Sequence, residues 1–259
     1  MLSRLTRPQA LAVCALPVVA LLAAVLFAPL PFSVARPGLT ADVLGSHRGA
    51  PVITIKGAPT HDTSGQLRMT AIEATGPEAS IHLGDVIGNW FDTDRAVMPR
   101  DAVYPSGDDL KEIEEHNAEQ MKESQDAAVT AALGYLDLED SGVDVSLSLE
   151  RVGGPSAGLL FSLGIIDKLG ADDLTGGRVI AGTGTITSGG KVGAVGGVPL
   201  KTQSARRDGA TVFLVPKAEC SEAQAQLPKG LRLIPVTTLK GAVDSLRALD
   251  SGKGEVPAC

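Results

Sequence analysis

The first clear pattern along the chain is a long apolar run near the amino terminus. No charged residue occurs between Pro8 and Ala35, and the sequence ALAVCALPVVALLAAVLFAPLPF fills that gap. A run of this length can cross a bilayer as a helix, whereas the apolar region of a cleaved signal peptide has about 7 to 15 residues. The pattern therefore predicts a short cytoplasmic tail over residues 1–9 and a transmembrane anchor over residues 10–32. A secreted protein released by signal cleavage is the alternative.

Positive charge around this run gives a weak indication of its orientation. Arg4 and Arg7 precede the run, and Arg36 and Arg48 follow it. Cytoplasmic flanks carry the excess of Lys and Arg, and the free amino terminus adds to the first pair. The bias predicts a single-pass protein with its amino terminus inside the cell and the rest of the chain outside the cytoplasm.

The next hundred residues change pattern three times. Residues 33–50 have scattered glycine, proline and charge without a period, which predicts a juxtamembrane linker. PVITIKG and GQLRMTAIEA then alternate apolar and polar residues, which predicts half-buried strands. Residues 76–110 mix short apolar pieces with proline and aspartate and are interpreted as an insertion. From Ser106 onward, strong helix formers with early acidic residues predict one long helix.

The remainder alternates between strand and helix patterns. Predicted strands lie in VDVSLSLE, RVIAGTGTI with KVGAV, TVFLV and LRLIPV, and predicted helices in Ser156–Leu169, GGVPLKTQSARRDGA, AECSEAQAQL and TTLKGAVDSLRAL. Such alternation predicts an α/β (α+β) domain with partly parallel strand pairing. We assign this domain to residues 51–248 and a tail to residues 249–259.

Composition narrows the classes of function. The chain has 259 residues and a net charge of −7, so the clustered basic charge of a nucleic-acid-binding protein is not expected. Cys14 lies in the apolar run, and Cys220 and Cys259 could pair in an oxidising compartment. All three are interpreted as structural.

One serine lies where a nucleophile could lie. Gly154, Pro155, Ser156, Ala157 and Gly158 fit the pattern G-x-S-x-G at a strand-to-helix turn, as in an α/β-hydrolase. That triad needs a later histidine, and each histidine precedes the serine: His47, His61, His82 and His116. The histidines and cysteines also lack metal-ligand spacing, and neither glycine-rich turn continues into a phosphate-binding loop. We therefore expect no metal and no cofactor.

Lysine is the base that remains for such a serine. Lys201 is predicted near the start of a helix, because Pro199 suits a first turn, and there the helix dipole opposes positive charge. Val195, Val198 and Leu200 are apolar neighbours that would desolvate the amine. Two structural alternatives stay open: Ser156 as a helix N-cap, and Lys201 as a lysine whose amine reaches water.

GGPSAG at 153–158, together with GTGTITSGGKVGAVGGVPLKTQSARRDGATVFLVP, resembles the proteolytic domain of Lon proteases. The resemblance covers roughly Gln66 to Val215 and includes MKESQDAAVTAAL, which is similar to the helix before the catalytic strand. It implies Ser156 as the nucleophile of the P-S-A-G turn and Lys201 as its base, four residues after a Gly-Gly pair. Thr183 matches a position near the dyad and could hydrogen-bond the lysine.

With its anchor, the chain is most similar to membrane-anchored bacterial Lon-domain proteins. Two departures stand out: no PDZ module fits in the short sequence GYLDLEDSG, and Gly153 occupies a position where energy-dependent Lon enzymes often have aspartate. No ATPase module is evident either. The resemblance implies a serine endopeptidase that acts on unfolded or loosely structured proteins and assembles as a ring, often of six. A catalytically silent adaptor that binds protein partners at the membrane surface is the alternative.

Overall fold

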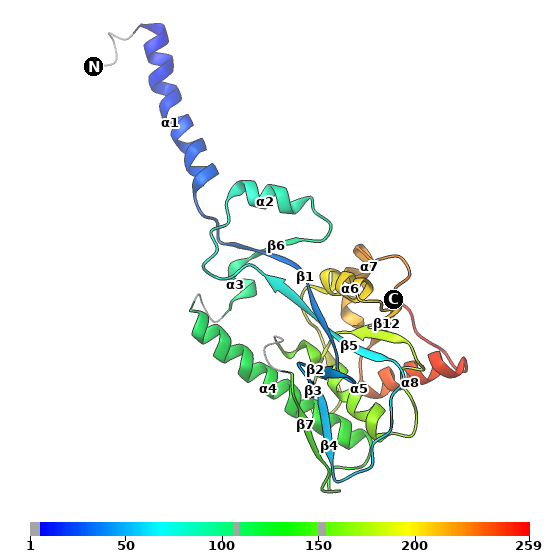
Figure 1. The fold of residues 1–259 in the computed structure, drawn as a ribbon. Helices are drawn as coiled ribbons and strands as arrows, with labels where there is room; N and C mark the ends of the chain where they lie inside the picture. The colour runs from blue at the N-terminus through cyan, green and yellow to red at the C-terminus, as the bar shows by residue number, and fades with distance from the viewer. Residues whose placement is uncertain (1–5, 106–108, 150–153) are drawn as a thin grey trace. The chain divides into compact units, whose positions relative to one another are not determined.

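A computed structural model describes residues 6–105, 109–149 and 154–259 (Figure 1). The chain divides into two compact units. Unit 1 contains residues 1–35 and 74–109, and unit 2 contains residues 36–73 and 110–259. The segment interpreted as an insertion therefore falls almost entirely in unit 1, together with the amino-terminal helix.

Unit 1 begins with helix α1 (Arg7–Phe27), which is long and apolar enough to cross a membrane by length and composition. The start of β1 (Phe32–Asp42) pairs antiparallel with β6 (Ala96–Pro99), so that Phe32 lies opposite Pro99. Helices α2 (Leu83–Trp90) and α3 (Arg100–Val103) flank β6 in sequence. A backbone hydrogen bond from Leu30 to Ile81, 2.7 Å long, joins the chain after α1 to the chain before α2.

Unit 2 is built on a sheet with the strand order β12-β11-β8-β5-β1. Pairing is parallel from β5 to β12. These strands span Gln66–Ala74 (β5), Val179–Gly182 (β8), Val212–Pro216 (β11) and Arg232–Val236 (β12). Parallel sheets are usually covered on both faces, and every residue of β11 is buried accordingly.

Side chains that alternate along β11 enter two different cores. Val212 and Leu214 belong to the larger cluster of buried apolar residues, whereas Phe213 and Val215 belong to a second one. The larger cluster includes residues of α4 (Leu110–Tyr135), α5 (Gly158–Leu169) and α8 (Leu239–Ser251). The second includes residues of α6 (Val198–Arg207) and α7 (Cys220–Ala225). The sheet thus separates two helical layers, and the mixed α/β fold predicted from the sequence is confirmed.

Short elements complete unit 2. Single 3-10 turns occur at Pro155–Ala157 (η2) and Lys217–Glu219 (η3). Three small antiparallel pairs are formed by β2 (Ser46–His47) with β3 (Ala50–Pro51), β4 (Ile53–Lys56) with β7 (Asp144–Leu147), and β9 (Thr185–Ile186) with β10 (Val192–Gly193).

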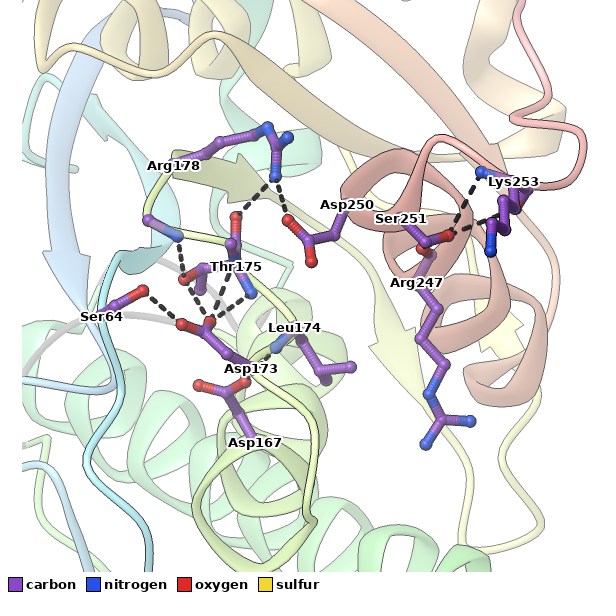
Figure 2. A network of polar contacts seen from close by, with 12 residues as sticks. Ser64, Asp167, Asp173, Leu174, Thr175, Arg178, Arg247, Asp250, Ser251 and Lys253 are labelled. Carbon is purple, nitrogen blue, oxygen red and sulfur yellow. Dashed lines mark hydrogen bonds and ion pairs between the residues drawn. The ribbon is translucent and has the colours of Figure 1, made fainter.

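A polar network lies in the loop that connects the carboxyl end of α5 to β8 (Figure 2). Asp173 accepts hydrogen bonds from the backbone N–H and the hydroxyl of Thr175, and also from Ser64. Arg178 then contacts Asp250 of α8 at 2.9 Å. This network fixes a loop between two buried elements, which is a structural role.

Three predicted boundaries differ from the bounds of the helices and strands in the structure. The proposed linker over residues 33–50 is largely the strand β1, whose hydrogen bonds to neighbouring strands hold it extended although its sequence has no clear alternation. The amino-terminal helix begins at Arg7 and ends at Phe27, because Pro29 disfavours a helical conformation of Ala28, which is extended. Helix α8 extends to Ser251, into the predicted tail, and Cys259 at the end of that tail forms a disulfide with Cys220.

Candidate active site

Ser156 lies in the 3-10 turn η2 that leads into α5. Gly154 has φ +73°, a value that favours glycine, and the following Pro155 starts the turn. The Pro155 carbonyl accepts a hydrogen bond from Ser124 of α4 at 3.0 Å, and Ala157 is fully buried. These neighbours hold the turn in place and leave Ser156 half-buried.

Close packing explains the last residue of the motif. A Cβ on Gly158 would come within 2.7 Å of the Ile186 side chain and 2.9 Å of the Ser124 hydroxyl. The turn is also joined to the end of β8 by two backbone hydrogen bonds. The Gly184 N–H donates to the Ser156 carbonyl at 2.9 Å, and the Leu159 N–H donates to the Gly184 carbonyl at 3.2 Å. Ser156 is therefore fixed against the segment that follows β8.

Lys201 is the fourth residue of α6. The helix begins after Gly197, which has the left-handed φ of +70° and lies so close to Ile72 that a Cβ would approach it to 2.9 Å. Pro199 is in the first turn, as predicted. The lysine is only 3% exposed, so the alternative in which its amine reaches water is wrong.

Thr183 connects the two residues. The Lys201 Nζ donates a hydrogen bond to Thr183 Oγ1 at 3.1 Å, and Thr183 Oγ1 lies 3.4 Å from the Ser156 carbonyl. Thr183 is fully buried and is held at the end of β8 by a backbone bond from its N–H to Leu214. The structure thus brings Ser156, Thr183 and Lys201 together from three elements that are far apart in sequence.

Burial lowers the pKa of Lys201 to about 8 from its ordinary value of 10.5, because the charged amine is desolvated. The carboxylates of Glu219 and Glu222 act in the opposite direction and limit the shift. At a pKa of 8, about one lysine in ten is neutral at pH 7. A neutral amine can accept a proton, which an ordinary surface lysine cannot do at this pH.

Glu219 is a neighbour that the sequence analysis missed. Its Oε1 accepts a hydrogen bond from the Val195 N–H at 2.8 Å, it is 8% exposed, and burial raises its pKa. One signal could have located it: Glu219 follows β11 closely, and Thr183 follows β8. Because β8 and β11 are parallel neighbours, residues after their carboxyl ends meet at one edge of the sheet.

Ser156 is not the N-cap of either helix, since Gly154 caps η2 and Ala157 caps α5. Gly153 lies outside the described residues. Across the three described ranges, no group of three or more His, Cys, Asp or Glu side chains is placed to hold a metal ion.

The family model of the Lon protease (S16) C-terminal proteolytic domain matches residues 116–246, which are 131 of the 259 residues. The chain is 42% identical over 79 residues to the Lon protease of Clostridioides difficile (strain 630), a match that covers 30% of this chain and 10% of that protein. It is 35% identical over 94 residues to the Lon protease of Mesomycoplasma hyopneumoniae (strain 232), covering 35% and 11% of the two chains.

These matches extend over about a tenth of the length of the curated relatives. The matched family region contains the Ser156 turn, Thr183 and Lys201, and it runs from α4 into α8. The chain therefore belongs to the family of the Lon protease (S16) C-terminal proteolytic domain.

Proposed function

We propose that this protein is a membrane-anchored serine endopeptidase that cleaves peptide bonds with Ser156 as nucleophile and Lys201 as general base. The observation that carries the proposal is the buried Lys201 amine, which is bonded to a threonine that also contacts the Ser156 backbone. A lysine in such surroundings can work as a base near neutral pH.

In the proposed reaction, neutral Lys201 accepts the proton of the Ser156 hydroxyl while the oxygen attacks the peptide carbonyl. The protonated lysine then gives the proton to the leaving amine, and an acyl group remains on Ser156. A water molecule, deprotonated by the same lysine, hydrolyses the ester and restores the serine. Thr183 positions the amine throughout, because its hydroxyl accepts an N–H from the lysine.

Backbone N–H groups near Ser156 would stabilise the oxyanion of the tetrahedral intermediate. The N–H of Gly158 already donates to Pro155, and the N–H of Leu159 donates to Gly184. We therefore assign the oxyanion to N–H groups at or before Ala157. This set of donors is smaller than the set that the sequence allows, because from the sequence alone any free N–H of the first helical turn is a candidate.

The substrates are proposed to be unfolded or loosely structured proteins, as the family resemblance implies. Helix α1 would anchor the enzyme in the membrane, with the catalytic unit outside the cytoplasm. The disulfide between Cys220 and Cys259 supports this placement, because disulfides persist in oxidising compartments and are rare in the cytosol.

The test is cleavage of an unfolded protein by the full chain in detergent micelles. We expect the Ser156→Ala variant to lose cleavage and Ser141→Ala, a change in an exposed loop, to retain it. A serine-reactive covalent probe should label Ser156, and the labelling rate should rise with pH through the titration of Lys201.

Cleavage by the Ser156→Ala variant at the unaltered rate would remove the proposed nucleophile. Absence of both cleavage and labelling in the unaltered protein, together with binding of unfolded chains, would instead favour a silent adaptor.

A further inference from the structure

The exposed aromatic side chains of this protein all lie in unit 1. The chain has only eight aromatic residues, and three of them are exposed: Phe27, Trp90 and Phe91, at 76%, 68% and 82%. The other five are half-buried or buried. Trp90 and Phe91 end the helix α2, a helix in which no residue is buried.

Helix α2 is amphipathic. Ile87, Trp90 and Phe91 have the spacing i, i+3, i+4 that places side chains on one face of a helix, and Ile87 is 53% exposed. Asp85 and Asn89 lie on the opposite face, where the Asn89 amide donates to the Asp85 carbonyl at 2.6 Å. The helix therefore presents an apolar face that none of the described residues of unit 1 covers.

The position of α2 indicates what covers this face. Helix α1 ends at Phe27, and three residues later Leu30 is hydrogen-bonded to Ile81, just before α2 begins. The backbones of α1 and α2 approach each other to within 8 Å (Figure 1). If α1 spans the bilayer, then α2 lies where the hydrocarbon core gives way to headgroups, and tryptophan is enriched at that level of a membrane.

We infer that α2 is an interfacial helix that inserts Ile87, Trp90 and Phe91 into the bilayer beside the end of α1. The inference rests on the proposed membrane anchor. Residues 82–95 contain three aspartates and one arginine, so the attachment is apolar and not electrostatic. The interfacial helix would give the region after α1 a second attachment to the same membrane.

Trp90 is the only tryptophan of the chain, so its fluorescence reports on this face alone. The full chain is reconstituted in phosphatidylcholine vesicles that contain lipids brominated either near the headgroup or near the chain end. We expect the emission of Trp90 to lie to the blue of that of a tryptophan in water. Bromine near the headgroup should quench it more strongly than bromine near the chain end, and iodide in the water should quench it only weakly. Added phosphatidylglycerol should not strengthen the quenching.

Matched variants test whether the apolar face of α2 causes the quenching of Trp90 by brominated lipids and its protection from iodide. Ile87→Ser combined with Phe91→Ser should restore emission in brominated vesicles and access of iodide. Leu227→Ser, which changes an exposed leucine in unit 2, should have no effect.

A second reporter separates this inference from the anchor. In a Trp90→Phe background, Leu16→Trp places the only tryptophan in the middle of α1, where bromine near the chain end should quench it. Quenching at position 16 without quenching at Trp90 would overturn the interfacial helix and leave the anchor. Quenching at Trp90 alone would support the helix and contradict the anchor.

Trp90 that is shielded from iodide but not quenched by either lipid would be covered by protein, for example by a second copy of the chain. Trp90 that is open to iodide in vesicles would be covered by nothing. Either result overturns the inference.

Discussion

Two regions of unit 2 bury an ionisable side chain near the end of a helix that disfavours its charge. Lys201 lies in the first turns of α6, and Asp167 lies in the last turn of α5. They are 3% and 1% exposed. Desolvation is the main cause of both shifts: it lowers the pKa of Lys201 to about 8 and raises the pKa of Asp167 to about 6.

The difference between them lies in their neighbours. Lys201 donates to Thr183, whose hydroxyl also contacts the Ser156 backbone. Asp167 accepts a hydrogen bond from the Leu174 N–H, and its second oxygen has no partner among the described residues (Figure 2). A shifted pKa therefore does not by itself identify a catalytic group. The comparison supports the proposed role of Lys201 as general base, whereas the contact of Asp167 with Leu174 holds the loop after α5.

The largest expected effect separates the two residues by activity. Lys201→Arg should reduce kcat/KM for peptide cleavage by about 10⁴-fold or more, because arginine stays protonated and cannot accept the serine proton. Asp167→Asn should leave the rate unchanged, as should Lys168→Arg, the matched lysine control at the end of α5. Equal losses in Lys201→Arg and Asp167→Asn would show that the comparison is wrong.

The next largest expected effect is on the free energy of unfolding. Each buried charge lowers it by about 3 kcal/mol, as the size of the pKa shift implies. This cost grows with rising pH for Asp167 and falls with rising pH for Lys201. Asp167 has a raised pKa in the folded state, so its penalty appears as pH rises from 3.8 to about 6 and is complete above that. Lys201 has a lowered pKa, so its penalty is complete below about 8 and disappears as pH rises to 10.5.

Hydrogen exchange of the α5 and α6 amides measures this difference. At pH 7, Asp167→Asn and Lys201→Met should each slow exchange relative to the unaltered protein. The slowing of exchange by Asp167→Asn should vanish at pH 4, and the slowing by Lys201→Met should vanish at pH 11. A slowing that is independent of pH would mean that packing, and not desolvated charge, is responsible.

Substitution of Thr183 should have a smaller effect than the loss of activity in Lys201→Arg and the stability changes at Asp167 and Lys201. Thr183→Val removes the acceptor of the Lys201 amine and should lower kcat by about 10- to 100-fold, which corresponds to about 1.4 to 2.8 kcal/mol. Thr183→Ser keeps the hydroxyl and should restore most of the rate, whereas a purely structural threonine would tolerate valine. The control is Thr54→Val, at an exposed position of β4.

Much of this region could be predicted from the sequence. The G-P-S-A-G motif predicts a turn before a helix because Gly154 needs a positive φ and Pro155 starts the turn. The position of Lys201 follows from Pro199 and from the glycine pair before it. These are local constraints, and local constraints are visible in a short stretch of sequence.

The parts that were missed depend on contacts between distant segments. The strand β1 has no alternating pattern, and it is extended because β5 and β6 pair with it. Glu219 reaches the site because a parallel sheet brings the ends of β8 and β11 together. The buried state of Asp167 depends on the folding back of the loop that contains Leu174. None of these contacts is specified by neighbouring residues.

The smallest expected effect is the most direct test of the comparison, because it changes the pKa of Lys201 without changing either residue of the proposed dyad. Glu219 raises that pKa, so Glu219→Gln should move the rising limb of kcat/KM, expected near pH 8, to lower pH. Glutamine keeps an oxygen for the Val195 N–H. Glu222→Gln, at an exposed position, should produce a weaker shift in the same direction, since water screens it. A limb that stays in place in both variants would mean that another group controls the profile.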